Sequence, residues 1–251
     1  MDLTAHRNKD IEKARAADLM AILPEDCGAN ALDVGARDGW YSVLLANRFD
    51  KVTALDLQMP NIRHPKIECV KGNAVKLDFN DGEFELIFCT EVLEHIPTGQ
   101  LIKVCSEIER VASKYIIIGV PFKQDIRVAR TKCYTCGKRN PPWGHINSFD
   151  ENYLRNLFSK CDVKKISFVG NSNECTNTLS VFLMDFAGNP YGTYHQEEPC
   201  IWCGANLKKP PSRTITQKIS TKMAFFIQNL QKTFHRSHPN WIHILFKKRK
   251  A

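Results

Sequence analysis

A short apolar segment that runs into a glycine-containing turn is the feature that most constrains the fold of this chain. Residues 31–34 predict a buried strand, residues 35–39 a turn and residues 40–48 a helix. This order is typical of the first unit of an α/β sheet, where the turn presents backbone N–H groups to a ligand. Gly35 and Gly39 would let a ligand approach the backbone closely.

Further strands and helices alternate along the chain. Strands are predicted over residues 51–57, 67–70, 85–90, 115–120, 165–169 and 179–186, and helices over residues 9–23, 91–111 and 150–158. Alternation at this spacing predicts an α/β fold with a parallel sheet covered on both faces. We expect a main domain over residues 1–187 with a long loop at 123–147, a connector at 188–211 and a basic amphipathic tail at 212–251.

The positive charge of the chain is confined to its last 45 residues. The formal net charge is +8, yet residues 207–251 hold eleven Lys or Arg and no Asp or Glu, which leaves 24 basic against 27 acidic residues in the body. The body therefore lacks the basic excess of a nucleic-acid-binding domain. The polar N-terminus has no signal-peptide pattern, and every apolar run is far shorter than the ~18 residues of a spanning helix, so we expect a cytoplasmic protein.

An acidic residue stands where a ribose-binding carboxylate is expected. Asp56 ends the second predicted strand, 17 residues after Gly39. A carboxylate at this end of the sheet can accept hydrogen bonds from both hydroxyls of a ribose. The turn and the acid together indicate a site for a nucleoside-containing cofactor. A nicotinamide site is the main alternative, but Gly-x-Gly-x-x-Gly is absent.

Two later segments add a family resemblance. They are Gly72-Asn-Ala74 and residues 79–96, which include the sequence Glu-Val-Leu-Glu-His at 91–95. Together with the turn, they resemble the class I S-adenosylmethionine-dependent methyltransferases, in the broad small-molecule group, over roughly residues 30–186. The resemblance implies S-adenosylmethionine as cofactor and a Rossmann-like sheet of seven mostly parallel strands, of which the last is antiparallel.

The resemblance also implies which residues contact the cofactor. The methionine end would lie at the glycine turn, the ribose at the end of the second strand, the adenine beside the third strand, and the fourth strand would form the floor. In that order the residues are Asp33, Gly35, Ala36, Arg37 and Gly39; Asp56 and Leu57; Asn73 and Ala74; and Cys89, Thr90 and Glu91. Two of them depart from the family pattern. Arg37 replaces a glycine and can pair with the methionine carboxylate, and Asn73 replaces an aspartate but keeps an acceptor oxygen for the adenine amine.

Two Cys-x-x-Cys-Gly sequences predict a structural zinc site. Cys133 and Cys136 form the first pair, and Cys200 and Cys203 the second. Four thiolates in two such pairs are typical of tetrahedral zinc, and disulfides are not expected in a reducing compartment. The 63 residues between the pairs exceed the ~15–20 of compact zinc modules. Folding must therefore bring the two loops together; redox chemistry or unpaired thiols are the alternatives.

A second constellation combines Glu91, Glu94 and His95 with His145. If residues 91–111 are helical, Glu91 and His95 lie four positions apart on one face, and Glu94 lies three from Glu91. Small-RNA 2′-O-methyltransferases and some ubiquinone-pathway O-methyltransferases resemble this pattern and use it for a divalent metal, whereas other members have the string without a metal. Two interpretations stay open: a second divalent metal at these four residues, or His145 alone as general base.

These observations favour methyl transfer to oxygen. Displacement at a sulfonium has an excellent leaving group, so the protein mainly aligns the nucleophile and excludes water. A hydroxyl acceptor must also lose its proton, for which His145 is the candidate base. We expect a small or lipid-linked acceptor, such as a sugar or a quinol. RNA methylation is one alternative, opposed by the acidic body, and a non-catalytic zinc-containing adaptor that retains the fold is another.

The basic tail predicts peripheral membrane association. Apolar residues recur there at three- and four-residue steps among lysines and arginines: Met223, Phe226, Ile227, Leu230 and Phe234. Residues 241–246 are largely apolar and precede the basic cluster 247–250, an arrangement typical of a membrane interface. The alternatives are packing of the apolar face on the body and binding of RNA.

Overall fold

The computed structural model describes residues 7–249 of the chain. It divides into two compact units, each assembled from segments that are far apart in the sequence. The first unit comprises the residues up to 122 together with 149–170 and those from 239 onward, and the second comprises residues 123–148 and 171–238.

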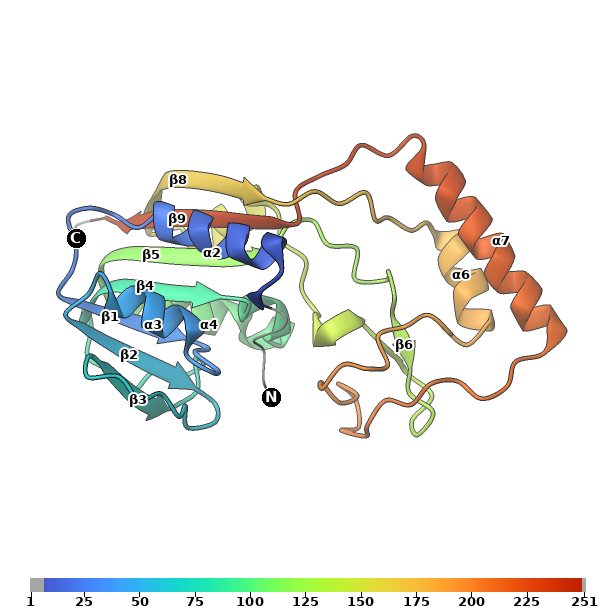
Figure 1. The fold of residues 1–251 in the computed structure, drawn as a ribbon, viewed down its shortest axis with the longest axis horizontal. Coiled ribbons are helices and arrows are strands. Elements are labelled where there is room, and N and C mark those ends of the chain that lie inside the picture. The colour runs from blue at the N-terminus through green and yellow to red at the C-terminus, as the bar shows by residue number, and fades with distance from the viewer. Residues whose placement is uncertain (1–6, 250–251) are drawn as a thin grey trace. The chain divides into compact units, whose positions relative to one another are not determined.

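A seven-stranded sheet forms the centre of the first unit (Figure 1). Its strand order is β3-β2-β1-β4-β5-β9-β8, and β9 alone runs antiparallel to its neighbours. The strands are β1 (Asn30–Val34), β2 (Lys51–Asp56), β3 (Ile67–Lys71), β4 (Phe84–Thr90), β5 (Ala112–Pro121), β8 (Cys161–Val169) and β9 (Trp241–Lys248). The predicted sheet of seven mostly parallel strands with an antiparallel last strand is confirmed.

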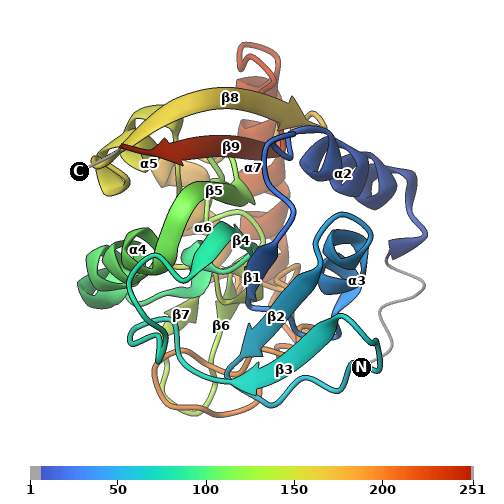
Figure 2. The same cartoon turned by 90° about the vertical axis from the view of Figure 1, so that its left-hand side faces the viewer.

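Helices cover both faces of this sheet (Figure 2). Helices α2 (Asp10–Ala21) and α3 (Trp40–Ala46) lie on one face, and α4 (Thr98–Val111) and α5 (Glu151–Leu157) on the other. Neighbouring residues of β4 point to opposite faces: Ile87 joins the apolar cluster under α4, and Phe88 the cluster under α2 and α3. Burial on both sides explains why these strands are continuously apolar, as parallel sheets require.

Residues 241–246, which the sequence analysis placed in the basic tail, form most of β9. This prediction was wrong, because the segment lies inside the sheet, between β5 and β8. Ile242 and Phe246 are fully buried, and the register pairs Leu245 with Ile117 of β5. An apolar run flanked by polar residues suits a doubly covered strand as well as a membrane interface. Lys250, in the predicted basic cluster, lies outside the described residues.

The predicted strand at 179–186 is instead helix α6 (Thr178–Phe186). Its start is fixed by a capping box, in which the Asn177 side chain accepts a hydrogen bond from the Ser180 backbone N–H and the Ser180 hydroxyl accepts one from the Asn177 N–H. These two bonds satisfy N–H groups that the first helical turn leaves unpaired. The apolar run at 179–184 resembles a buried strand when Asn177 is not recognised as a cap.

The predicted helix at 91–111 is interrupted. A single turn of 3-10 helix, η1 (Leu93–His95), is followed by Pro97 and only then by α4. The residue before a proline is disfavoured in the helical region, and Ile96 is accordingly extended. Glu91 has a φ of 55° and lies outside any helix. The expectation that Glu91 and His95 share one helical face was therefore wrong.

The second unit contains little sheet. It has the two-stranded β6 (Thr131–Lys132) and β7 (Arg139–Asn140), the turn η2 (Pro142–Gly144), helix α6 and the long helix α7 (Ile215–Lys232). A capping box formed by Thr214 and Gln217 begins α7. No helix within residues 7–249 is both long and apolar enough to cross a bilayer.

Candidate functional site

Three strand ends of the first unit meet at the point where the strand order reverses. β1 lies between β2 and β4, so the chain proceeds from β1 in one direction and returns to add β4 on the other side. Ligands of open α/β sheets bind outside the carboxyl ends of the strands at such a reversal. The predicted cofactor residues follow these ends: the glycine turn follows β1, Asp56 ends β2, and Thr90 ends β4.

The turn after β1 uses three residues with left-handed backbone. Gly35, Arg37 and Gly39 have φ values of 81°, 50° and 80°. A Cβ atom at Gly35 would lie 2.3 Å from the Val92 side chain, and one at Gly39 would lie 2.3 Å from Ile62. Both glycines are therefore required by conformation and by close packing. The sequence argument, which considered only approach of a ligand, missed these two neighbours.

Asp56 ties the turn to the end of β2. Its Oδ2 accepts a hydrogen bond from the Arg37 backbone N–H at 2.9 Å, and its Oδ1 accepts one from the N–H of Gln58 at 3.2 Å. The Gly35 and Ala36 N–H groups donate to the Leu55 carbonyl, at 2.8 and 3.0 Å. The carboxylate is thus held in a fixed orientation at the sheet edge, where it can accept further bonds from a ribose.

Asp33 is a buried acid of this site with a perturbed pKa. It is 3% exposed, and the Ser42 hydroxyl of α3 donates to its Oδ2 at 2.5 Å. Burial raises the pKa of Asp33 to about 7, although the bond from Ser42 acts in the opposite direction. A carboxyl that titrates near neutral pH beneath a ligand-binding turn can become ionised when a cationic ligand binds above it.

The predicted adenine edge lies in the loop after β3. Asn73 uses its side-chain oxygen to accept the Val75 N–H at 3.0 Å, which shapes this loop, and Ala74 is buried. Leu57, directly after Asp56, is 65% exposed and leaves an apolar surface at the end of β2. Leu57 and the Asn73 side-chain oxygen thus provide an apolar surface and a hydrogen-bond acceptor, which suit a heteroaromatic base.

The residues at the end of β4 provide a floor with no reactive thiol. Cys89 is fully buried, and burial raises its pKa well above the ordinary value. Glu91 pairs with Arg15 of α2 at 2.9 Å, and Arg15 also pairs with Glu12 at 3.0 Å. The sequence analysis missed Arg15 and Glu12. Their only signal was a charged pair at three-residue spacing on a helix expected to cover the sheet.

His145 belongs to the second unit and is 8% exposed. Its Nδ1 lies 2.7 Å from Oε1 of Gln124. Since an amide oxygen can only accept, Nδ1 donates this hydrogen bond, and in the neutral imidazole Nε2 is then the basic nitrogen. This tautomer is the one that a general base requires. The metal interpretation combines His145 with Glu91, Glu94 and His95 of the first unit, and it stays a prediction.

The four cysteines of the predicted zinc site converge in the second unit. All their sulfur atoms lie within 4.8 Å of one another. Sγ of Cys133 is 3.7 Å from that of Cys203, and Sγ of Cys136 is 3.7 Å from that of Cys200. Zinc–sulfur bonds of ~2.3 Å in a tetrahedron place the sulfurs about 3.8 Å apart. The donor set and its spacing therefore fit a tetrahedral metal, and all ten cysteines are free thiols rather than disulfides.

The two Cys-x-x-Cys loops have the same backbone pattern. The N–H of Gly137 donates to the Cys133 carbonyl at 2.9 Å, and the N–H of Gly204 donates to the Cys200 carbonyl at 2.8 Å. Both glycines are left-handed, with φ values of 74° and 71°. Backbone N–H groups of Cys136 and Thr135 lower the pKa of Cys133 to about 6. Such N–H groups stabilise thiolates, the form that binds a metal.

Side chains also join one cysteine loop to the other. The Trp202 indole N–H donates to the Arg139 carbonyl at 2.8 Å, and the Ile201 N–H donates to Oδ1 of Asn140 at 2.9 Å. The ammonium of Lys138 lies 4.6 Å from the Trp202 ring centre, within cation–π distance. These contacts hold the two loops together without a metal. They explain how two cysteine pairs separated by 63 residues form one cluster.

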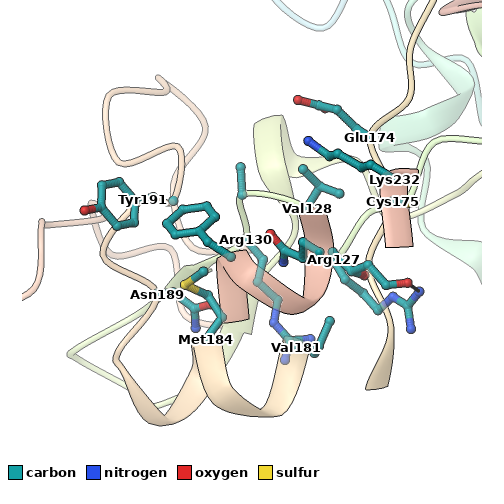
Figure 3. A pocket seen from close by; sticks show the side chains of 15 residues that line it. Arg127, Val128, Arg130, Glu174, Cys175, Val181, Met184, Asn189, Tyr191 and Lys232 are labelled. Carbon is teal, nitrogen blue, oxygen red and sulfur yellow. Dashed lines mark hydrogen bonds between the residues drawn. The ribbon is translucent and has the colours of Figure 1, made fainter. Parts of the chain in front are cut away.

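A pocket of about 210 Å³ lies elsewhere in the second unit, between α6, α7 and the segment 127–130 (Figure 3). Apolar side chains from both helices form part of its wall, including Val181, Met184 and Phe225. Arg130 at this wall is paired with Asp185. Burial raises the pKa of Cys175, so this thiol is not an activated nucleophile. The pocket suits a partly apolar ligand and contains no evident catalytic group.

Comparison with known proteins agrees with this geometry. Residues 32–115 match the family described as "Methyltransferase domain". The chain is 30% identical over 105 residues to trans-aconitate 2-methyltransferase of Deinococcus radiodurans, a match covering 37% of this chain and 38% of that protein. It is 27% identical over 105 residues to a ubiquinone biosynthesis O-methyltransferase of Xanthomonas axonopodis pv. citri, covering 37% and 44%.

A solved structure extends the likeness over nearly the whole chain. The N-methyltransferase NodS of Bradyrhizobium japonicum, in complex with S-adenosyl-L-homocysteine, superposes with a TM-score of 0.53 at 12% identity, covering 98% of this chain and 92% of that one. The chain has a class I methyltransferase fold. Its matches to the two curated methyltransferases span about two fifths of their length.

The buried carboxyl of Asp33 predicts a specific pH dependence of the protein's stability. Because its pKa is raised to about 7 in the folded state, the folded protein holds a proton that the unfolded chain releases above pH ~4. This group therefore lowers stability progressively as pH rises to about 7, with no further effect above. Asp33→Asn removes this loss. The unfolding free energy of the variant minus that of the wild type should therefore be larger at pH 8 than at pH 5, by roughly 1–4 kcal/mol.

Urea unfolding of the wild type and Asp33→Asn at both pH values measures this effect. The difference between the two proteins cancels the titration of all other groups, including the cysteines. A difference in unfolding free energy that is the same at both pH values would show that Asp33 is ionised throughout.

Proposed function

We propose that this protein is an S-adenosylmethionine-dependent methyltransferase. The observation that carries the proposal is the carboxylate of Asp56, held by two backbone N–H groups at the end of β2 beside the left-handed turn after β1. The match of residues 32–115 to a methyltransferase domain supports it. The fold of NodS, whose structure contains the methyl-transfer product S-adenosyl-L-homocysteine, supports the choice of cofactor.

The chemistry of the residues present supports this cofactor. Asp56 would accept the ribose hydroxyls, and Leu57 with Ala74 would line the adenine. Arg37, which is exposed beside the turn, would pair with the methionine carboxylate. Asp33 would compensate the positive charge of the amino group or the sulfonium. The bound cofactor supplies the methyl group on a good leaving group, and the chain's own part is to hold and orient it.

For the acceptor we propose a hydroxyl of a small or lipid-linked molecule, such as a sugar or a quinol. The trans-aconitate and ubiquinone-pathway enzymes that the chain resembles are named for small molecules. His145 would remove the proton, because its Nδ1 is engaged by Gln124 and the lone pair stays on Nε2. RNA methylation is the second candidate, and a divalent metal at Glu91, Glu94, His95 and His145 is the alternative route to an activated hydroxyl.

We also propose that Cys133, Cys136, Cys200 and Cys203 hold a structural zinc ion. Sulfur separations of 3.7 Å support this assignment over a disulfide, whose sulfurs lie about 2.05 Å apart. Zinc would replace repulsion among four crowded thiolates with coordination bonds. It would also close a loop of more than 60 residues, which disfavours the unfolded chain.

Asp56→Ala should weaken the binding of S-adenosylhomocysteine by at least ~10-fold, because a charged acceptor of hydrogen bonds is worth roughly 1.5 kcal/mol or more. Titration calorimetry measures this, with Asp78→Ala, an exposed acid after β3, as the matched control. Thermal unfolding confirms that both variants are folded. Equal affinity of Asp56→Ala and wild type would remove the ribose assignment, and no binding to the wild type would favour a non-catalytic adaptor.

One zinc ion per chain should co-purify with the protein. The double variant Cys200→Ser/Cys203→Ser should lose it, and Cys69→Ser/Cys175→Ser, which changes two thiols outside the cluster, should retain it. Elemental analysis of the three proteins gives the result. Full zinc content in the first variant would rule out the four-cysteine site.

His145→Ala should lower methyl transfer to a hydroxyl acceptor at least ~100-fold, as expected for loss of a general base, with unchanged affinity for S-adenosylhomocysteine. His195→Ala, an exposed histidine of the same unit, is the control. Transfer of tritiated methyl groups to small-molecule, lipid and RNA fractions identifies the acceptor class. Inhibition by a chelator that magnesium reverses, together with loss of activity in Glu94→Ala, would favour the metal route instead.

A further inference from the structure

Helices α6 and α7 form an antiparallel hairpin whose contact surface is made of small and polar residues (Figure 1). The Asn177 side chain before α6 donates to Oε1 of Gln231 near the end of α7, at 2.7 Å. The Ser220 hydroxyl of α7 donates to the Leu183 carbonyl of α6 at 2.8 Å. Ser180 on α6 and Ala224 on α7 are fully buried.

Nine large apolar side chains of the hairpin are exposed to solvent instead, although others such as Val181, Met184 and Ile227 are half-buried. On α7, the exposed residues recur at steps of four, four, three and four, which places them on one face of the helix. They are Ile215, Ile219, Met223, Phe226 and Leu230 on α7, with Leu179, Phe182 and Phe186 on α6 and Phe234 just beyond α7. Each of these nine residues is more than half exposed.

This pattern is the reverse of a water-soluble helix pair. Two helices in water bury their large apolar side chains between them and turn small and polar residues outward. Small residues and hydrogen bonds within the contact, with apolar residues outside, are typical of helices that pack within lipid. Large exposed apolar residues gathered along helices in this way mark an interaction site. The nine apolar residues are called the apolar face below.

Positive charge predominates on the hairpin, whose acidic neighbours are Asp185 on α6 and Glu174, which lies beside Lys232. Residues 207–238 contain seven Lys or Arg and no acidic residue. Lys218 and Lys222, both exposed, lie one turn apart in a row along the edge of the face on α7. Asp185 itself is engaged by Arg130 and Arg139. A partner that covers this surface must therefore be apolar in the middle and anionic at the border.

We propose that the α6–α7 hairpin docks, lying in the plane of the interface, on a membrane that contains anionic lipids. The apolar face would enter the boundary between headgroups and acyl chains, and the row of lysines would meet lipid phosphates. A second copy of the chain fits less well, because pairing two such faces brings two lysine rows together. RNA would leave the apolar residues unburied. The docking does not depend on the methyl acceptor, although it would bring the protein to a lipid-linked one.

The docking element differs from the tail that the sequence analysis proposed. Helix α6 contributes three apolar residues that the sequence analysis assigned to a strand. Residues 241–246 do not belong to the docking element, because they form β9. Ile227, which was counted in the apolar face from the sequence, is half-buried. Deleting the chain from residue 213 onward would remove β9 from the sheet, so only point substitutions test this proposal.

The test is sedimentation of the full chain with vesicles of phosphatidylcholine alone, or of phosphatidylcholine mixed with phosphatidylglycerol. The wild type should bind the mixed vesicles. Phe182→Ser/Phe226→Ser should weaken binding at least ~10-fold, since two phenylalanine side chains no longer leave water. Lys218→Gln/Lys222→Gln should weaken it about fivefold or more at low salt and have little effect at high salt.

Two control variants match these changes on α4 and β8 of the other unit. Ile102→Ser removes an apolar residue that is as exposed as those of the hairpin, and Lys103→Gln/Lys164→Gln removes two exposed charges. Both should bind vesicles as the wild type does. In addition, Phe226→Trp should be quenched by brominated phosphatidylcholine more strongly than Ile102→Trp, which reports insertion of the face itself.

Three results would overturn the proposal. One is absence of binding to the mixed vesicles at low salt, and another is equal weakening by hairpin and control variants. The third is light scattering that finds a dimer which Phe182→Ser/Phe226→Ser converts to a monomer, because the apolar face would then be covered by a second copy. RNA binding that is lost in the lysine variant but not in the phenylalanine variant, without vesicle binding, would identify the other anionic partner.

Discussion

The insertion of β9 between β5 and β8 is the constraint on which the rest of the structure depends. The chain completes β8 at Val169 and then passes through about 70 residues, most of them in the second unit. It returns at Trp241 to form β9, which pairs with β5 on one side and β8 on the other. β9 hydrogen-bonds on both sides and buries Ile242, Ile244 and Phe246. Without it, β8 has no partner and the sheet ends at an exposed apolar edge on β5. Both ends of the segment 171–238 are thereby fixed to adjacent strands.

The sequence predicted the structure correctly where the local residue pattern fits only one place in the folded protein. Strands β1 to β5 are apolar runs at regular spacing, and the turn after β1 with Asp56 has the order of a nucleotide-binding α/β unit, so the sheet and the candidate site followed directly. Prediction failed where one local pattern suits two environments. The segment 241–246 is apolar enough for a membrane interface or a central strand, and only its pairing with residues 115–121 and 161–169 decides between them.

Other segments were predicted wrongly although the sequence contains a local signal for the correct structure. In these segments the apolar composition suggested a different element. The capping box of Asn177 and Ser180 marks the start of α6, yet the apolar run at 179–184 resembles a strand. Pro97 separates η1 from α4, although the residues around it favour a helix. Within the site, the buried pairing of Arg15 with Glu91 joins α2 to the end of β4, and no sequence spacing encodes a contact 76 positions apart.

The turn after β1 combines conformational strain with a buried carboxyl. Arg37 adopts a left-handed φ although it is not a glycine, and its N–H is held by the Asp56 carboxylate. Asp33 lies beneath the turn with its pKa raised by burial. Both features are unfavourable for the protein alone. In the proposed complex, hydroxyl donors at Asp56 and positive charge near Asp33 would offset this cost, as expected for a preorganised binding site.

The second unit obtains its order by different means. A hairpin with so many exposed apolar residues gains little hydrophobic stabilisation from its own contact surface, where the buried residues include Ser180, Ser220 and Ala224. Order must come from elsewhere in the unit: from two capped helix starts, from the hydrogen bond between Asn177 and Gln231, and from the cysteine cluster that joins residues 133–136 to 200–203. A metal at that cluster would stabilise the unit without an apolar core. The unit can then keep its apolar residues at the surface, where the proposed membrane partner, rather than the protein interior, would cover them.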